Sequence, residues 1–210
     1  MSYAVKECFL TLQGEGVQAG SRAVFLRFAG CNLWSGREQD RATAQCTFCD
    51  TDFVGTDGDG GGKFADANAL AEHVERLWGP GEDRRLVVIT GGDPMLQLDE
   101  ALVDALHERR FRVAAETNGT LPAAPGIDWI CVSPKAVTYV VQRSGNELKL
   151  VWPQSGIDPA ELERWAFDHF LVQPMDCDDL AASIDAAIKL AMERPKWRLT
   201  LQAHKVVGLA

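Results

Sequence analysis

The sequence predicts an α/β fold, a partial, TIM-like β/α barrel of about six parallel strands in one domain that spans residues 1–210. Strand-like and helix-like segments alternate over most of the chain, which is typical of parallel β/α units. The 210 residues fall short of the roughly 250 that a complete eight-fold barrel needs. Polar residues also recur where the predicted strands end, and in parallel β/α folds the chemistry gathers at that edge of the sheet.

The N-terminal third contains one predicted strand between loops. Residues 8–20 end in LQGEGVQAG, whose glycines favour a loop in which the backbone closely approaches another group. Residues 21–30 (SRAVFLRFAG) are rich in β-branched and aromatic side chains and are expected to form a strand. Residues 55–63 (GTDGDGGGK) are expected to be a flexible loop, and they lack the pattern of a phosphate-binding loop.

The rest of the chain alternates between predicted strands and helices. The strands lie at residues 85–90 (RLVVIT), 112–117 (RVAAET), 127–135 (IDWICVSPK), 147–152 (ELKLVW), 169–175 (HFLVQPM) and 197–205 (WRLTLQAHK). Apolar residues at helical spacing predict three helices, around residues 70–77, 98–106 and 180–188. A further helix is expected after Asp158, because Asp caps well and Pro159 suits the first helical position.

The predicted strand ends carry polar residues. They are Arg27, Cys31, Thr90–Gly92, Glu116, Ser133–Lys135, Gln173–Asp176 and His204–Lys205. Any single one of them could be an ordinary loop residue or a helix cap. Because the carboxyl ends of parallel strands share one edge of a sheet, their agreement in position favours a common site at that edge.

Composition and charge narrow the class of protein. With 46% hydrophobic and 24% charged residues, the chain has the balance of an ordinary soluble globular protein. The net charge of −9 argues against non-specific binding to nucleic acid or anionic membranes, so neither is expected as a partner. No apolar run approaches a membrane span, and the N-terminus lacks the apolar region of a signal peptide. Six cysteines without a disulfide-scaffold pattern then predict a cytoplasmic protein.

Three cysteines follow the strand predicted at residues 21–30. Fourteen residues separate Cys31 from Cys46, and two separate Cys46 from Cys49. A CxxC turn brings two thiolates to one side, and three thiolates without a clear fourth ligand suit a [4Fe–4S] cluster. A structural zinc site normally has four protein ligands, and a disulfide would leave one of the three cysteines unpaired. From the spacing alone, an iron–sulfur cluster, zinc and unlinked thiols all stay open.

The wider sequence resembles the radical S-adenosylmethionine (SAM) superfamily, and within it the 7-carboxy-7-deazaguanine synthase family. The superfamily's usual CxxxCxxC spacing is lengthened here in its first gap, but CTFC at residues 46–49 matches its second half. GGDP at residues 91–94 resembles its GGEP motif. The closer resemblance rests on LQGEGVQAG, AVFLRFAGCNLW, CTFCDTDF, TGGDP, ETNGT, VSPK, LVQPMD and LTLQAHKVVGL, which span nearly the whole chain.

This resemblance implies a lyase-type enzyme of queuosine (7-deazapurine) biosynthesis. It would contract the ring of 6-carboxy-5,6,7,8-tetrahydropterin to 7-carboxy-7-deazaguanine with loss of ammonia. The implied cofactors are a [4Fe–4S] cluster, SAM and Mg²⁺. The implied partners are the pterin substrate, a second copy of the chain in a homodimer, and an electron donor such as flavodoxin. A 5′-deoxyadenosyl radical from SAM would remove hydrogen from C6 of the pterin and return it after the rearrangement.

The resemblance also implies the roles of individual residues. The cluster ligands would be Cys31, Cys46 and Cys49, in a cluster-binding loop at residues 31–50, and Thr51 would bind Mg²⁺. SAM would contact Phe48, Cys49, Asp50, Gly92, Ser133, Pro134, Lys135, Gln173, Pro174, Met175 and Asp176. The pterin would contact Leu12, Gln13, Gly14, Glu15, Arg27, Thr90, Glu116 and His204. No catalytic residue is implied beyond the cluster and SAM.

Two other functions compete with this one. Another radical SAM enzyme, such as an activase of glycyl radical enzymes, would need a surface that accepts a protein loop, and the chain has no room for an added docking domain. A zinc-binding interaction protein would use the same cysteines with a fourth ligand. Iron and acid-labile sulfide analysis separates the zinc protein from either radical SAM enzyme.

Overall fold

The computed structural model describes residues 2–209, and in this range it contains nine strands, five α-helices and two short 3-10 helices. The strands are β1 (Tyr3–Leu12), β2 (Arg22–Phe28), β3 (Gly62–Phe64), β4 (Leu86–Gly91), β5 (Arg112–Thr117), β6 (Trp129–Val132), β7 (Ser144–Trp152), β8 (Ala166–Pro174) and β9 (Trp197–Leu199). The α-helices are α1 (Ala67–Trp78), α2 (Glu100–Glu108), α3 (Pro159–Leu162), α4 (Leu180–Glu193) and α5 (Ala203–Val207). The 3-10 helices are η1 (Glu38–Thr43) and η2 (Pro94–Leu96).

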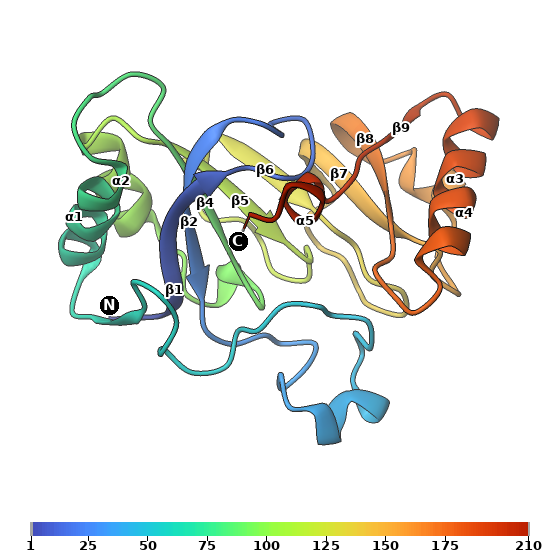
Figure 1. Cartoon of the computed structure of the whole chain (residues 1–210), viewed down its shortest axis with the longest axis horizontal. Coiled ribbons are helices and arrows are strands. Elements are labelled where there is room, and N and C mark those ends of the chain that lie inside the picture. Colours follow the sequence, from blue (N-terminus) through green and yellow to red (C-terminus); the bar gives the residue numbers. More distant parts are fainter. Residues whose placement is uncertain (1, 210) are drawn as a thin grey trace.

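All the described strands belong to one sheet, in the order β3-β1-β2-β4-β5-β6-β7-β8-β9. Every neighbouring pair from β2 to β9 is parallel, whereas β1 pairs antiparallel with both β2 and β3. Figure 1 shows the sheet as an open arc, with α1 and α2 beside one end and α3 and α4 beside the other. The predicted partial β/α barrel is therefore confirmed.

The N-terminal segment differs from its prediction. Residues 8–12 were expected in a loop, but they belong to β1, and the loop begins only at Gln13. The register with β2 shifts between Val5 and Glu7 of β1, and beyond this shift Cys8 is fully buried opposite Leu26 of β2. The glycines that favour a loop lie further on, in the stretch from Gly14 to Gly20, so they do not interrupt the strand.

The C-terminal segment also differs from its prediction. A strand was expected over residues 197–205, but β9 ends at Leu199 and residues 203–207 form the short helix α5. The backbone N–H of Ala203 donates to the carbonyl oxygen of Gly14 at 2.8 Å, which draws the chain across the sheet edge instead of along it. His204 and Lys205 therefore lie on a helix that crosses the mouth of the barrel, in dark red at the centre of Figure 1.

Aspartates cap the N-termini of α1, α2, α3 and α4. Asp66, Asp99, Asp158 and Asp179 each accept a hydrogen bond from a backbone N–H in the first turn of the helix that follows. Such caps satisfy N–H groups that have no partner within the helix. The helix start predicted at Asp158 is confirmed.

Two apolar clusters hold the helices on the sheet. One lies between α1, α2 and strands β1 to β5, and it includes the fully buried Leu70, Leu102 and Leu106. The other lies between α4 and strands β7 and β8, and it includes Leu150 and Ala187. With the helices covering this face of the sheet, the opposite face at the strand ends stays available for polar groups. No helix in the described range is long and apolar enough to cross a membrane.

The first cluster makes a prediction for stability. Leu102 is completely buried between α2 and the sheet, so Leu102→Ala should lower the free energy of unfolding by about 2–5 kcal/mol through lost burial and a residual cavity. Met192→Ala, on the exposed face of α4, should change it by less than about 0.5 kcal/mol. Urea unfolding measures both, and equal effects would contradict the assigned core.

Candidate active site

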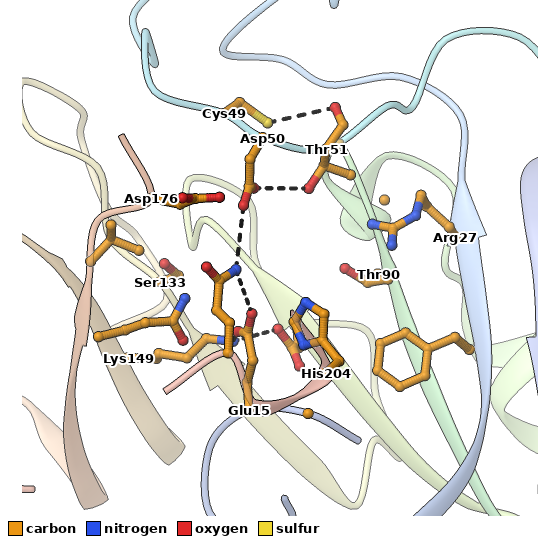
Figure 2. Close-up of a pocket in the computed structure, with 18 of the residues that line it drawn as sticks. Glu15, Arg27, Cys49, Asp50, Thr51, Thr90, Ser133, Lys149, Asp176 and His204 are labelled. Atoms are coloured by element: carbon orange, nitrogen blue, oxygen red, sulfur yellow. Dashed lines mark hydrogen bonds and ion pairs between the residues drawn. The ribbon is translucent and has the colours of Figure 1, made fainter. Parts of the chain in front are cut away.

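A cavity of about 430 Å³ lies at the edge of the sheet where the parallel strands end (Figure 2). Strand register brings the polar ends together: Arg27 of β2 pairs with Thr90 of β4, and Val151 of β7 with Gln173 of β8. The volume suits a small molecule or cofactor. The prediction of a shared site at this edge agrees with the observed geometry.

Most residues predicted for a binding role line this cavity. All the residues predicted for the pterin do so: Leu12, Gln13, Gly14, Glu15, Arg27, Thr90, Glu116 and His204. So do most of those predicted for SAM, the cluster or Mg²⁺: Cys46, Phe48, Cys49, Asp50, Thr51, Gly92, Ser133, Lys135, Gln173, Pro174 and Asp176. Cys31, Pro134 and Met175 are not among the described lining residues. That a residue lines the cavity shows only where it lies, so the role of each residue in binding stays a prediction.

Lys149 is the central charge of the cavity floor. Its Nζ lies 2.7 Å from Oε2 of Glu116 and also contacts the carboxylate of Glu15, while its side chain is only 4% exposed. Burial alone would lower the pKa of Lys149, but the charges of Glu116 and Glu15 outweigh burial and raise this pKa well above its usual value. In return, Lys149 holds the pKa of Glu116 below its usual value, although burial opposes it. The floor thus presents a fixed cation between two carboxylates.

Sequence reasoning did not single out Lys149. The signal was available, because Glu147 and Lys149 are charged residues at alternate positions of a predicted strand and therefore share one face of it. Leu148 and Leu150 fill the other face and are fully buried. Gly91 and Lys205, expected at the shared edge without an individual role, also line the cavity. Other lining residues that were not predicted for the site are Glu7, Phe9, Phe25, Asp52, Thr117, Asn118, Val151 and Gln202.

The loop after β1 is held against the floor and against α5. Gln13 donates from Nε2 to Oε1 of Glu116 at 2.9 Å. Gly14 lies directly under His204, since a Cβ on this glycine would come within 2.3 Å of the imidazole Nδ1. Any side chain at Gly14 would therefore displace His204 from the cavity wall.

The three cysteines of the cluster-binding loop lie near one another at the side of the cavity opposite Lys149. Cys46 and Cys49 line it, and Cys31 lies directly behind Gly92, whose missing side chain would come within 2.5 Å of the Cys31 Cβ. The thiols of Cys31 and Cys46 have pKa values raised chiefly by burial, and the three cysteines influence one another electrostatically. Among the described cysteines, none forms a disulfide.

This donor set fits a cluster better than a single ion. A [4Fe–4S] cluster takes each thiolate on a different iron, so its ligands stand further apart, and three of them leave one iron for another molecule. The thiols of Cys31, Cys46 and Cys49 therefore suit the predicted cluster, whereas tetrahedral zinc would need a fourth ligand.

The wall between the cysteines and the floor is rich in charged groups. Lys135 donates from Nζ to Oγ of Ser133 at 2.6 Å and lies over the ring of Phe48 at 5.6 Å from its centroid. Burial lowers the pKa of Lys135. Lys205 of α5 bonds both Asp50, at 2.6 Å, and Asp176, so the C-terminal helix joins the cluster-binding loop to the end of β8.

Asp93 is not among the described residues that line the cavity. It is completely buried and accepts hydrogen bonds from the Thr117 hydroxyl at 2.8 Å and from the Asn118 backbone N–H at 2.7 Å. Burial raises the pKa of Asp93 despite these bonds. This carboxylate therefore ties the end of β4 to the end of β5, and the adjacent Gly91 and Gly92 are the residues of the GGDP motif that reach the cavity.

Lys149 makes a testable prediction. Lys149→Met should leave the buried carboxylates of Glu15 and Glu116 uncompensated and lower the free energy of unfolding by about 3–5 kcal/mol at pH 8. This loss of unfolding free energy should become smaller towards pH 5. Without Lys149, burial raises the pKa of Glu116, so the carboxylate becomes protonated as the pH falls and no longer carries an unpaired charge.

Urea unfolding at the two pH values measures this effect. Lys189→Met is the control, since it removes a lysine from the exposed surface of α4 and should cost less than about 1 kcal/mol. A Lys149→Met deficit that is the same at both pH values would contradict the assigned charge balance.

Comparisons with known proteins match this chain to a sequence family and to a solved structure. The sequence model of the Radical SAM superfamily matches residues 39–146, a range that includes Cys46, Cys49 and Gly91–Gly92 and begins after Cys31. The crystal structure of QueE from Escherichia coli matches with a TM-score of 0.71 and 27% identity, over 97% of this chain and 95% of that one.

Curated relatives match over their full length. A 7-carboxy-7-deazaguanine synthase of Bordetella pertussis is 60% identical and one of Caulobacter vibrioides is 61% identical, each over 100% of both chains. One from Bacteroides thetaiotaomicron is 37% identical, again over 100% of both chains. The chain therefore belongs to the 7-carboxy-7-deazaguanine synthase family of the radical SAM superfamily.

Proposed function

We propose that this chain converts 6-carboxy-5,6,7,8-tetrahydropterin to 7-carboxy-7-deazaguanine and ammonia, as a radical SAM lyase of queuosine biosynthesis. Substrate and product differ only by ammonia, so the overall reaction consumes no oxidant. The observation that carries the proposal is a single cavity with Cys46 and Cys49 at one side, Cys31 behind its Gly92, and the Glu15–Lys149–Glu116 floor at the other side. That arrangement suits a radical source facing a polar, planar substrate.

The cofactors would occupy the side of the cavity near the cysteines. Cys31, Cys46 and Cys49 would hold the [4Fe–4S] cluster, and Phe48, Gly92 and Ser133 stand where SAM would meet it. When bound, the cluster and SAM would supply the radical chemistry, a reversible removal of hydrogen from C6 of the pterin. A side chain at Gly92 would strike the carbonyl oxygen of Gly30 and the Cys31 Cβ, so glycine keeps this approach open.

The floor would bind the pterin ring. Ionised carboxylates accept hydrogen bonds, and the pterin edge offers several N–H donors, so Glu15 and Glu116 are suited to hold it. Lys149 keeps these carboxylates in place and Glu116 ionised. With these groups fixed by one another, the ring would be oriented before any radical forms.

Arg27 would bind the carboxylate of the substrate. Its Nε donates to Oε1 of Glu7 at 2.6 Å, which fixes the guanidinium, and Figure 2 shows its terminal nitrogens turned towards the cavity. A guanidinium fork matches the geometry of a carboxylate. Thr51, on the same side of the cavity as Asp50, would supply one hydroxyl to Mg²⁺, which prefers hard oxygen ligands and retains water.

The proposed partners are a second copy of the chain and a one-electron donor. Apolar side chains are exposed at Leu199, Leu201, Val206 and Val207, which supports burial of this C-terminal region in a homodimer. An electron donor such as flavodoxin is needed because the cluster must be reduced before SAM is cleaved. A cytoplasmic location is supported by free thiols that need reducing conditions.

An anaerobic assay tests the function. Reconstituted, reduced protein is mixed with SAM, Mg²⁺ and 6-carboxytetrahydropterin, and mass spectrometry should detect 7-carboxy-7-deazaguanine without proportional consumption of SAM. If 5′-deoxyadenosine forms without the deazapurine, the cluster assignment stands and the substrate is wrong. If an iron-loaded protein yields neither, the radical SAM activity itself is refuted.

The Mg²⁺ site has its own test. Thr51→Ala should raise the Mg²⁺ concentration for half-maximal activity by roughly tenfold or more, because a direct oxygen ligand is lost. Thr51→Ser keeps the hydroxyl and should stay close to the original requirement. An unchanged Mg²⁺ requirement in Thr51→Ala would remove Thr51 as a ligand.

A further inference from the structure

The fourteen residues between Cys31 and Cys46 form an ordered insert. Residues 32–45 contain the 3-10 helix η1, and Figure 1 shows this segment in light blue, projecting from the lower edge of the molecule away from the sheet. A short gap between two cluster cysteines limits where their thiols can lie. With fourteen residues, the spacing alone imposes no such limit. Contacts of the turn with other side chains, those of the insert among them, therefore hold the thiols in place.

Arg41 makes the contacts that reach the cysteine turn. Its Nη1 donates to the carbonyl oxygen of Thr47 at 3.0 Å and to that of Cys49 at 3.0 Å. Both carbonyls belong to the CTFC turn that carries the second and third thiols. One guanidinium nitrogen therefore bridges two points of the turn, and a positive charge is placed beside it.

Arg41 is itself held from two other sides. Its Nε donates to the carboxylate of Glu38 at 2.8 Å, one turn earlier in η1. Its guanidinium lies 4.1 Å from the centroid of the Trp34 ring, and this ring packs edge-on against Phe53 at 5.6 Å between centroids. Trp34 and Phe53 are both buried, so the arginine packs against an aromatic pair that joins the start of the cluster-binding loop to the residues just after its end.

We propose that Arg41 is a positioning residue for the iron–sulfur cluster. It fixes the CTFC turn through two carbonyls, and it places a permanent positive charge beside the backbone carbonyl of Cys49. The inference rests on the proposed cluster, and it assigns to the insert the task that close cysteine spacing performs in the usual CxxxCxxC motif.

The charge has a consequence for electron transfer. Reduction adds one negative charge to the cluster, and a nearby cation favours the more negative state. Arginine stays charged at every accessible pH, so the effect does not depend on protonation. Arg41 should therefore make the cluster easier to reduce as well as harder to lose.

Three variants separate these effects. Arg41→Gln removes both the charge and the bridge, and Arg41→Lys keeps the charge but lacks the planar fork. Arg37→Gln is the matched control, because it removes the same charge from the exposed side of the same insert, at a side chain that makes none of these contacts with the turn. The reconstituted proteins are compared by redox titration followed by electron paramagnetic resonance, and by the rate at which a chelator removes iron.

We expect a more negative midpoint potential in Arg41→Gln than in the unaltered protein, with Arg41→Lys and Arg37→Gln close to the unaltered value. Iron loss should be on the order of tenfold faster in Arg41→Gln and in Arg41→Lys, since each loses hydrogen bonds from a charged donor. An unchanged potential and rate in Arg41→Gln would overturn the proposal. If the midpoint potential of Arg37→Gln or of Arg41→Lys shifted as much as that of Arg41→Gln, the charge of Arg41 would have no specific effect on the cluster.

Hydrogen exchange of the cluster-free proteins keeps the test independent of metal loading. Amides of residues 46–52 should exchange faster in Arg41→Gln than in the unaltered chain, while amides of β4 keep their protection. Equal exchange in residues 46–52 would refute the bridge. If the unaltered protein bound no iron, the proposed function would fail, and the exchange result would still decide whether Arg41 holds the turn.

Discussion

The site depends on one buried group of charges, Lys149 between Glu15 and Glu116. Taking three charged side chains out of water is costly, and only their close pairing offsets that cost. The three residues come from the loop after β1, from β5 and from β7, so satisfying the charges fixes the relative positions of these segments. A floor arranged in this way has little freedom left to reorganise, which suits a reaction in which a reactive radical must meet a single hydrogen atom.

The parallel core of the fold was predictable from the sequence, because continuous apolar segments that end in polar residues are typical of strands covered on both faces. The strand ends at Arg27, Thr90 and Glu116 then located the cavity, since parallel strands must place their carboxyl ends together. The predicted pterin residues were found from motifs that resemble a known family, and the structure brings all of them to one cavity.

What could not be predicted depends on contacts between distant segments. The strand character of residues 8–12 is set by pairing with β2, and the helix at residues 203–207 is set by the contact of Ala203 with Gly14. Lys149 lies inside an apolar strand, and only the fold reveals that its side of the strand faces other charges. Arg41 lies in a polar segment without periodicity, where no local pattern distinguishes a bridging arginine from a solvated one.

The long gap between Cys31 and Cys46 adds only a small entropic cost to closing the cluster-binding loop. Lengthening a flexible gap from three to fourteen residues adds about 1.4 kcal/mol of closure entropy. A hydrogen bond from a charged donor contributes about 1.5–3 kcal/mol, so the bonds of Arg41 to the turn can offset the whole increase. The extended spacing between Cys31 and Cys46 is therefore compatible with a well-defined position for the thiols.

Two sets of contacts in the site differ in how far apart along the chain their partners lie. Those of Arg41 with the cysteine turn and of Trp34 with Phe53 join residues within about twenty positions of one another, whereas Glu15 meets Lys149 across 134 positions and Gln202 across 187. Short-range contacts form early in folding, and long-range ones must wait for most of the chain to be in place. The bridge from Arg41 to the cysteine turn is thus local enough to form before the floor, whereas the floor needs both ends of the chain in place.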